Sequence, residues 1–435
     1  MGHFSQFQPR RQQVFDKMVE NSVAVVAAGK NQYRNGDTEY PFRQDSYFYY
    51  LTGFEESHAI VVLVKKQQKQ WCILFCQEKD PSVEMWTGER VGVQGALQLG
   101  FDAAYPLQDA PFQFSELLED ITTVYHLIHH QGAFDKKLFS WISKVRKKTR
   151  QGIQAPYQFI DLRKIVNELR LIKTPEELVA VRRACEISVH AHIQAMQRCQ
   201  AGMHEYELEA ILLQEFYRQG SRYPAYPSIV ASGNNACTLH YTRNNSVIAA
   251  KDLVLIDAGA EYKNYAADIT RVFPASGQFS APQQAIYELV LASQMAAIEQ
   301  VASGVTWDRM QQRILEVLVA GLVDLKILKG TVSTLIAEKA YLPFYMHSSG
   351  HWLGLDVHDV GDYKTDGQWR ALREGMLLTI EPGLYFAESN VLVPEKWRGI
   401  GVRIEDDILV TKQGAEVLTD GAPKTVREIE KLHAL

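Results

Sequence analysis

The chain has 435 residues, with 51 Asp and Glu against 46 Lys and Arg, so its formal net charge is −5. Hydrophobic residues make up 46% of the chain, and its 18 Phe, 20 Tyr and 7 Trp can close a large core, which excludes a disordered chain. The small negative charge gives no electrostatic basis for binding nucleic acid or an anionic membrane. The length predicts two or three domains.

The five cysteines stand at positions 72, 76, 185, 199 and 237, an odd number with no CxxC spacing. This pattern is typical of reduced thiols and not of a disulfide framework or a zinc ribbon. No apolar run approaches the ~18–20 residues that a membrane helix needs. Residues 1–11 are polar and lack the apolar core of a signal peptide. We therefore expect a cytoplasmic protein.

The first 172 residues alternate strand-like and helix-like stretches. Apolar runs at residues 22–28, 59–64 and 71–75 are typical of buried strands, and residues 115–120 with their flanks suit a short helix. This alternation predicts an α/β domain over residues 1–172.

A different pattern begins near residue 170, and we place the domain boundary at 172/173. The segment Thr174-Pro175-Glu176-Glu177 has an N-cap Thr, a proline at the first helical position and a glutamate three residues after the cap. It predicts a helix over 178–199, and a second helix over 205–219 ends at a glycine. Strands follow, interrupted by a helical region at about 282–325, which predicts an α+β domain with an antiparallel sheet over 173–435.

Two aspartates flank the polar turn of a predicted hairpin. Asp257 ends the apolar run 253–257, and Asp268 lies in the run 265–271. A turn at 262–263 would place them directly opposite each other, whereas a turn at 263–264 would make them diagonal on one face. Opposed side chains in a hairpin have Cβ atoms ~4.5–5.5 Å apart, so two ionised carboxylates there call for a cation. The alternative is two aspartates that flank the turn and point to solvent.

A cluster of histidines follows. His347, His351 and His358 fall within twelve residues of an otherwise apolar, glycine-punctuated stretch. Each histidine alone also fits a half-buried ring bonded to the backbone.

Two glutamates end or interrupt apolar strand-like runs. Glu381 follows the run 378–380 and precedes a turn. Residues 401–410 are predicted as one strand, in which period-two alternation puts three side chains on one face: Arg403, Glu405 and Asp407. An exposed edge strand would also explain the second pattern.

Together these segments supply two Asp, one His and two Glu on separate strands of one predicted sheet. Oxygen-rich ligands with one imidazole suit Mn²⁺, Co²⁺, Fe²⁺ or Zn²⁺. Four carboxylates balance two divalent cations, and two cations ~3.5–4 Å apart would bridge a water and clamp both the attacking and the leaving oxygens.

The five residues Asp257, Asp268, His351, Glu381 and Glu405 resemble the ligand signature of the pita-bread metallopeptidases, which include methionine aminopeptidase, prolidase and aminopeptidase P. The segments 351–359, 399–407, 40–44 and 50–54 are similar to the bacterial aminopeptidase P branch. The resemblance covers most of the chain. It implies an α/β N-terminal domain plus an α+β C-terminal pita-bread domain with a curved antiparallel sheet.

One departure from the family pattern lies just before His351. Bacterial members carry a bulkier segment where this chain has Ser348-Ser349-Gly350. The departure leaves the ligand intact, and we make no prediction for the shape of the pocket beside it.

The resemblance implies a metalloaminopeptidase that removes the N-terminal residue from peptides with proline in second position. A metal-bridging hydroxide on a dinuclear site would attack the carbonyl of the first residue. Two divalent ions are implied, Mn²⁺ first, with Co²⁺, Zn²⁺ or Fe²⁺ as alternatives. The enzyme would be a homotetramer or a dimer.

The resemblance also implies a role for each site residue. The metal ligands would be Asp257, Asp268, His351, Glu381 and Glu405, with Asp268 and Glu405 bridging both ions. Glu381 would also accept the proton of the attacking water, and His240 and His358 would be catalytic residues beside the scissile peptide. The substrate-binding positions would be His347, Tyr385, Arg403 and Trp86, the last reaching into the site of a neighbouring subunit.

Three other interpretations stay open. Prolidase is the nearest, and it differs by cutting only Xaa-Pro dipeptides. A creatine amidinohydrolase shares the two-domain layout but lacks the carboxylate ligands, so the sequence disfavours it. A metal-free pita-bread binding module, as in some histone chaperones, would have lost ligands, whereas all five are present here.

Overall fold

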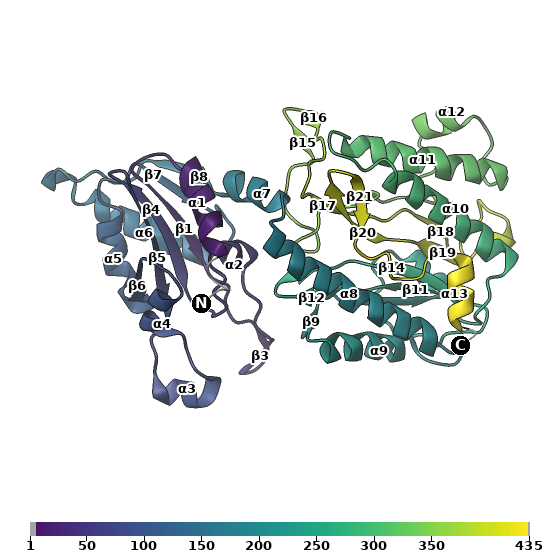
Figure 1. Cartoon of the computed structure of the whole chain (residues 1–435), viewed down its shortest axis with the longest axis horizontal. Helices are drawn as coiled ribbons and strands as arrows, with labels where there is room; N and C mark the ends of the chain where they lie inside the picture. The colour runs from purple at the N-terminus through teal and green to yellow at the C-terminus, as the bar shows by residue number, and fades with distance from the viewer. Residues whose placement is uncertain (1–5, 434–435) are drawn as a thin grey trace. The chain divides into compact units, whose positions relative to one another are not determined.

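The computed structural model describes residues 6–433, and the chain divides into two compact units, Met1–Leu169 and Arg170–Leu435 (Figure 1). Helix α7 (Arg163–Leu171) crosses this division. The predicted domain boundary at 172/173 lies close by and stays a prediction.

The N-terminal unit is built on a mixed six-stranded sheet. Its strands are β1 (Ser22–Ala27), β4 (Ile60–Lys66), β5 (Lys69–Cys76), β6 (Ala103–Pro106), β7 (Thr123–His126) and β8 (Gln158–Asp161). Their order is β6-β5-β4-β1-β7-β8, in which β4 runs antiparallel to both of its neighbours and the other pairs are parallel. A separate ribbon pairs β2 (Tyr33–Asn35) with β3 (Thr38–Glu39).

Helices cover both faces of this sheet. They are α1 (Phe7–Lys17), α2 (Ser46–Thr52), α4 (Gly92–Gln98), α5 (Ala110–Leu117) and α6 (Gly132–Arg146), with short 3-10 turns at Leu107–Asp109 and Thr149–Gln151. A further helix, α3 (Pro81–Thr87), has no buried residues and lies on a loop away from the sheet (Figure 1). In Figure 1, α5 and α6 lie on one face of the sheet and α1 and α2 on the other. Phe114 of α5 stacks on Trp141 of α6, with ring centroids 4.4 Å apart, over the apolar side chains of β1 and β4.

The predicted strands at 22–28, 59–64 and 71–75 and the α/β class are confirmed, because these apolar runs are buried between helices. The helix predicted at 115–120 is wrong in its bounds. It begins at Ala110, with Pro111 in its first turn, and it ends before Asp120, whose φ of +57° is left-handed.

The C-terminal unit begins with the two predicted helices. α8 (Pro175–Arg198) has the expected capping box, in which Thr174 and Glu177 each accept the other's backbone N–H. α9 (Glu205–Arg218) is followed by Gly220 with a φ of +93°. The single helical region predicted at 282–325 is two helices, α10 (Ala281–Ile298) and α11 (Trp307–Asp324), because the chain turns through Gly304 at a φ of +91°. Two shorter helices follow: α12 (Val332–Ala337) and α13 (Val426–His433).

Thirteen short strands among the described residues of this unit form antiparallel ladders only, and they confirm the α+β class. They are β9 (Tyr223–Pro224), β10 (Ile229–Ser232), β11 (Leu253–Asp257), β12 (Ala260–Tyr262), β13 (Tyr265–Ala266), β14 (Thr270–Pro274), β15 (Lys364–Thr365), β16 (Gln368–Trp369), β17 (Leu377–Ile380), β18 (Gly383–Phe386), β19 (Ile400–Arg403), β20 (Asp406–Thr411) and β21 (Gly414–Val417). The ladders are β10-β11-β14, β13-β12-β9, β17-β20-β21, β18-β19 and β15-β16.

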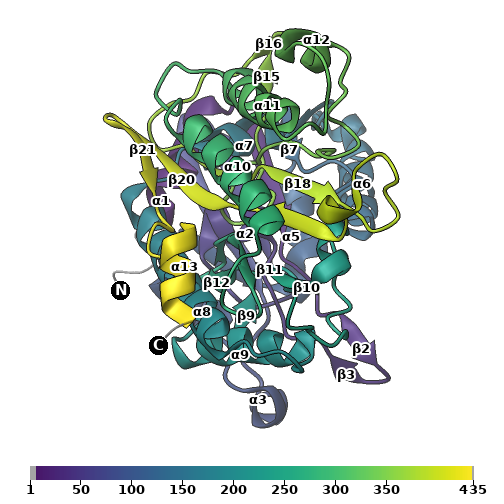
Figure 2. The same cartoon turned by 90° about the vertical axis from the view of Figure 1, so that its right-hand side faces the viewer.

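The central strands of this unit lie between two helix pairs, α8 with α9 and α10 with α11 (Figure 2). α8 contacts β12 and α10 contacts β19, so the sheet residues between them form one large apolar core. Within residues 6–433, no helix combines the length and hydropathy needed to cross a membrane.

Candidate metal centre and active site

The hairpin that carries Asp257 and Asp268 adopts the second of the two predicted registers. Lys263 and Asn264 form the turn with φ values of +49° and +64°, as a two-residue type I′ turn requires. Asp257 therefore pairs with Thr270, and Asp268 lies diagonally from it, just before β14. Both aspartates are buried, so the solvent-facing alternative is wrong.

A tyrosine joins the two aspartates. The Tyr226 hydroxyl lies 2.7 Å from Asp257 Oδ1 and also contacts Asp268 Oδ1. No sequence pattern marks Tyr226, because it lies in an irregular segment about thirty residues before the hairpin. Its sequence neighbours, Ala225 and Pro227, carry no metal-site pattern.

His351 and Glu381 approach the hairpin from neighbouring segments. His351 Nε2 lies 3.4 Å from Asp268 Oδ2 and 3.8 Å from Glu381 Oε1. Its Nδ1 lies 3.0 Å from the carbonyl oxygen of Trp352. A backbone carbonyl on one ring nitrogen leaves the other nitrogen free to bind a metal, which is the usual arrangement of a ligating histidine.

Glu405 lies at a break between two strands. The single strand predicted over 401–410 is β19 and β20, because the Ile404 N–H donates to Pro382 and the Glu405 N–H donates to Thr270 instead of continuing one ladder. The period-two alternation of side chains predicted over 401–410 is therefore interrupted at this break. Arg403 and Glu405 line the site cavity, whereas Asp407 does not, so the predicted shared face is wrong for Asp407.

One cavity of about 610 Å³ gathers most of the predicted site residues. All five predicted ligands line it, together with His240, His347, His358 and Arg403. Its remaining walls are largely apolar or aromatic: Leu239, Trp307, Tyr363 and Trp369, with Ser348 and Gly350 beside them. No motif pointed to this aromatic wall, since its members are scattered along the sequence.

Tyr385 and Arg403 connect the cavity to the aspartate pair. The Tyr385 hydroxyl lies 2.8 Å from His347 Nε2 and 3.2 Å from Arg403 Nη1. Arg403 Nη2 donates to Asp257 Oδ2 at 2.5 Å. Trp86 is in the other unit, on α3, where its side chain is 84% exposed.

The segment before His351 is tightly built. Ser349 is buried, and its hydroxyl contacts Tyr345 and the Gln311 side chain. A Cβ on Gly350 would lie 2.0 Å from the Thr379 carbonyl oxygen, so only glycine fits there. The departure noted at 348–350 therefore leaves an ordered wall beside the ligand.

The carboxylates of the site repel one another. Burial raises the pKa of Glu381 to about 7, although His351 and Arg403 oppose the shift. Burial and the neighbouring acids raise the pKa of Glu405 well above its usual range, and burial also raises that of Asp257 against the pull of Arg403. Burial disfavours the charged form of His351, but Asp268 and Glu381 outweigh it and raise its pKa to about 9. The group holds more negative charge than Arg403 and His351 can balance.

This donor set fits divalent cations. Asp268, His351 and Glu405 each offer one ligand atom, and these atoms lie within 4.8 Å of one another. Four carboxylates and one imidazole are the donors that Mn²⁺, Zn²⁺ and related ions accept. Bound cations would offset the burial and the mutual repulsion that raise the pKa values of these acids.

Comparison with known proteins gives a consistent result. Residues 179–412 match the model of metallopeptidase family M24, and residues 7–125 match the aminopeptidase P N-terminal domain. The chain is 46% identical over 429 residues to the Xaa-Pro aminopeptidase of Escherichia coli (strain K12), covering 98% of this chain and 97% of that one.

Solved structures agree over nearly the full length. The aminopeptidase PepP of Pseudomonas aeruginosa superposes with a TM-score of 0.97 at 48% identity, covering 99% of this chain and 98% of that one. Zinc-substituted aminopeptidase P of E. coli, in complex with product, also gives a TM-score of 0.97, at 45% identity and with the same coverage. The predicted fold class, with its pita-bread domain, is confirmed.

The fold and the matched families define a metal-dependent exopeptidase, a hydrolase. The chain belongs to metallopeptidase family M24, in the branch that carries an aminopeptidase P N-terminal domain.

Proposed function

We propose that this protein is an Xaa-Pro aminopeptidase, which hydrolyses the bond between the first residue of a peptide and a proline in second position. The observation that carries the proposal is the convergence of four carboxylates and one imidazole, from five separate segments, on one cavity. The names of the E. coli and P. aeruginosa relatives support the choice of aminopeptidase over prolidase. The full set of candidate ligands disfavours a metal-free binding module.

Two divalent cations would complete this site, with Mn²⁺ first and Co²⁺, Zn²⁺ or Fe²⁺ as alternatives. Asp257, Asp268, His351, Glu381 and Glu405 would hold them, and Asp268 and Glu405 would each hold both ions. The zinc-substituted relative supports a divalent metal. When bound, such cations supply a water of lowered pKa and polarise the scissile carbonyl.

Glu381 is the proton carrier of the reaction. It takes the proton of the attacking water and passes it to the proline nitrogen, which leaves as an amine. Its place at the end of β17, with its carboxylate 3.8 Å from His351 Nε2, supports this role because the carboxylate lies at the wall of the cavity.

His358 and His240 act on the carbonyl side of the scissile bond. Burial and the nearby His351 lower the pKa of His358, so its ring is neutral at pH 7 and donates one N–H to the developing oxyanion. His240, His347, Tyr385 and Arg403 orient the peptide.

Proline in second position determines which groups of the peptide the site can hold. An Xaa-Pro bond is a tertiary amide without an N–H, so the enzyme cannot hold the bond through that donor. It must hold the carbonyl oxygen and the terminal amine instead. Cavity-lining carboxylates for the amine and histidine donors for the carbonyl meet this requirement.

We include four further assignments in the proposal. The functional domains are residues 1–172 and 173–435, the protein is cytoplasmic, and it works as a homotetramer or dimer. Trp86 reaches a neighbouring subunit's site. Its exposure, together with that of Met85 on a helix with no buried residues, supports a contact role.

The activity is tested with metal-reconstituted protein on three substrates: an Xaa-Pro dipeptide, an Xaa-Pro-Yaa tripeptide and an Xaa-Ala-Yaa tripeptide. We expect release of the first residue from the Xaa-Pro-Yaa peptide and little from the Xaa-Ala-Yaa peptide. Cleavage of the dipeptide alone would make the protein a prolidase. No activity with any of the four cations would favour a binding module.

A further inference from the structure

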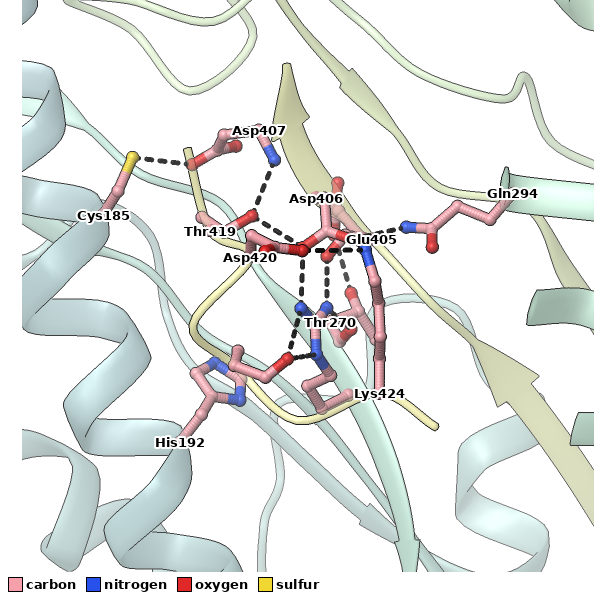
Figure 3. Close-up of polar contacts among 12 residues, drawn as sticks. Cys185, His192, Thr270, Gln294, Glu405, Asp406, Asp407, Thr419, Asp420 and Lys424 are labelled. Atoms are coloured by element: carbon pink, nitrogen blue, oxygen red, sulfur yellow. Dashed lines mark hydrogen bonds and ion pairs between the residues drawn. The ribbon is translucent and has the colours of Figure 1, made fainter. Parts of the chain in front are cut away.

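The three consecutive acids at 405–407 have three different environments (Figure 3). Glu405 lines the cavity, and its Oε2 accepts from the Thr270 hydroxyl at 2.6 Å. Asp406 and Asp407 are fully buried outside the cavity. Burying two more acids next to a crowded set of carboxylates is costly unless each is bonded to a partner, so their contacts indicate what they do.

Asp406 is held by four donors. Its Oδ1 accepts from Arg271 Nη2 at 2.6 Å and from the Thr419 hydroxyl at 2.7 Å. Its Oδ2 accepts from Lys424 Nζ at 2.8 Å and from Gln294 Nε2 at 3.0 Å, both visible in Figure 3. Asp406 therefore fixes the position of the Arg271 guanidinium.

Arg271, in turn, ties together the backbone of both ligand-bearing segments. Its Nη1 donates to the carbonyl oxygen of Glu405 at 2.6 Å and to that of Thr270 at 3.0 Å. Its Nε and Nη2 both donate to the Ala422 carbonyl, at 3.3 Å and 3.1 Å. Thr270 follows Asp268 by two residues. The planar, fully buried guanidinium of Arg271 therefore links the strand after Asp268 to the backbone of Glu405.

Asp407 makes the complementary contact. Its Oδ2 accepts the backbone N–H of Asp268 at 3.1 Å. The same oxygen also contacts the Cys185 thiol (Figure 3). Its own N–H donates to the Thr419 hydroxyl, the same hydroxyl that donates to Asp406. The backbone of Asp268 is thus bonded to β20, and the backbone of Glu405 to β14.

We infer that Arg271, anchored by Asp406, and Asp407 are positioning residues that form a backbone clamp between Asp268 and Glu405 and so set the spacing of the two carboxylates that would hold both metal ions. The inference rests on the proposed two-metal site. Groups that orient ligands without touching the metal are typically worth 10–100-fold in metal affinity. A bridging pair depends most on such spacing, because each carboxylate must reach both ions.

The test replaces the Arg271 guanidinium but keeps a positive charge at this position. Arg271→Lys leaves a cation opposite Asp406, but an ammonium cannot reproduce the planar set of donors that reaches two carbonyls at once. Arg182→Lys is the matched control, because Arg182 makes a two-point contact with Glu416 at 2.5 and 2.8 Å on the exposed surface of the same unit.

The measurements are Mn²⁺ titration by calorimetry and the EPR spectrum of the loaded protein, with circular dichroism to verify folding. For the wild type and Arg182→Lys we expect two ions per chain and an exchange-coupled spectrum. For Arg271→Lys we expect the second ion to bind about 10–100-fold more weakly, with loss of the coupled signal at equal Mn²⁺.

A second pair of variants covers the case in which Arg271→Lys does not fold. Asp407→Leu leaves the Asp268 N–H without its acceptor, whereas Asp407→Asn keeps an acceptor oxygen at the same place. We expect Asp407→Leu to lose the exchange-coupled EPR signal and Asp407→Asn to retain it.

The outcomes separate the clamp from the proposed function. A coupled spectrum and unchanged second-ion affinity in Arg271→Lys, or in Asp407→Leu if the former does not fold, would overturn the clamp while leaving the two-metal site in place. A wild type that binds one ion only, with no coupled signal, would overturn the two-metal site and the clamp together.

Discussion

Glu405 and Asp406 are neighbours in the chain and are both buried, at 2% and 0% exposure, yet their pKa values shift in opposite directions. Burial and the acids around it raise the pKa of Glu405. Burial would raise that of Asp406 too, but Arg271 and Lys424 outweigh it and lower the pKa. The difference lies in the partners and not in the burial.

This comparison separates two kinds of buried acid. Asp406 with its cationic partners Arg271 and Lys424, here called the anchor, is neutralised by the protein's own cations and holds strands in place. The five candidate ligands Asp257, Asp268, His351, Glu381 and Glu405, here called the cage, are left short of positive charge. Such a deficit is costly in a folded chain unless something from outside supplies that charge. A deficit of this kind marks a binding site more clearly than burial does.

The largest effect should come from the cage. Glu381→Ala removes a candidate ligand and the proton carrier together, so we expect at least ~10³–10⁴-fold loss of kcat on an Xaa-Pro-Yaa peptide. Glu388→Ala, an exposed glutamate seven residues further on, is the matched control and should retain activity. Near-normal turnover by Glu381→Ala would remove Glu381 from the mechanism.

The anchor should matter for stability. Asp406→Ala leaves Arg271 buried without its carboxylate, so the free energy of unfolding should fall by about 3–5 kcal/mol. Glu416→Ala breaks an exposed pair with Arg182 and should cost about 0–1 kcal/mol. Urea denaturation measures both, and equal costs would show that the anchor is not a distinct structural element.

His358 should affect catalysis without affecting metal content. Its ring centroid lies 4.3 Å from that of His351, but it is not among the candidate ligands. We expect His358→Ala to lower kcat by about 10²–10³-fold, the usual cost of one oxyanion donor, with bound metal near normal by elemental analysis. Full activity would exclude the role, and loss of metal would make His358 part of the cage.

The pH dependence of stability should change sign with metal. Glu381, with its pKa raised from 4.5 to about 7, and His351, with its pKa raised from 6.5 to about 9, bind more protons in the folded than in the unfolded chain across those windows. The metal-free protein should therefore lose stability as pH rises through these windows. With saturating Mn²⁺ the trend should reverse, because ligands must lose protons to bind.

The measurement is Tm by calorimetry from about pH 5 to pH 9, with EDTA or with Mn²⁺. The anchor should not contribute to either slope, because the lowered pKa of Asp406 makes its contribution present above about pH 3.8 and lost only below it. If the EDTA-treated protein gained stability with rising pH, this result would contradict the inference that the cage is short of positive charge.

Much of the fold followed from local patterns. The buried strands of the N-terminal sheet, the capped start of α8 and the length of α9 could be predicted because apolar periodicity and capping act over a few residues. The long helical region at 282–325 was predicted without its break, since the turn at Gly304 is set by how α10 and α11 pack on each other.

Local sequence patterns likewise predicted only part of the candidate site. Its five candidate metal ligands were selected from spacing and resemblance, and the structure brings them to one cavity. Tyr226, Arg271 and the aromatic wall were not selected. Their parts in the site depend on partners that are far apart in the sequence, and no local pattern marks them.

The sequence by itself determined which residue types the site contains, the two registers open to the hairpin and the α/β and α+β character of the two halves. Only the tertiary structure decided that Lys263 and Asn264 form the turn, that the strand breaks at Glu405, and which of three adjacent acids faces the cavity. The physical reason is that side-chain alternation is a local property. The partners that neutralise Asp406 and leave Glu405 short of positive charge come from distant segments, and only folding brings them together.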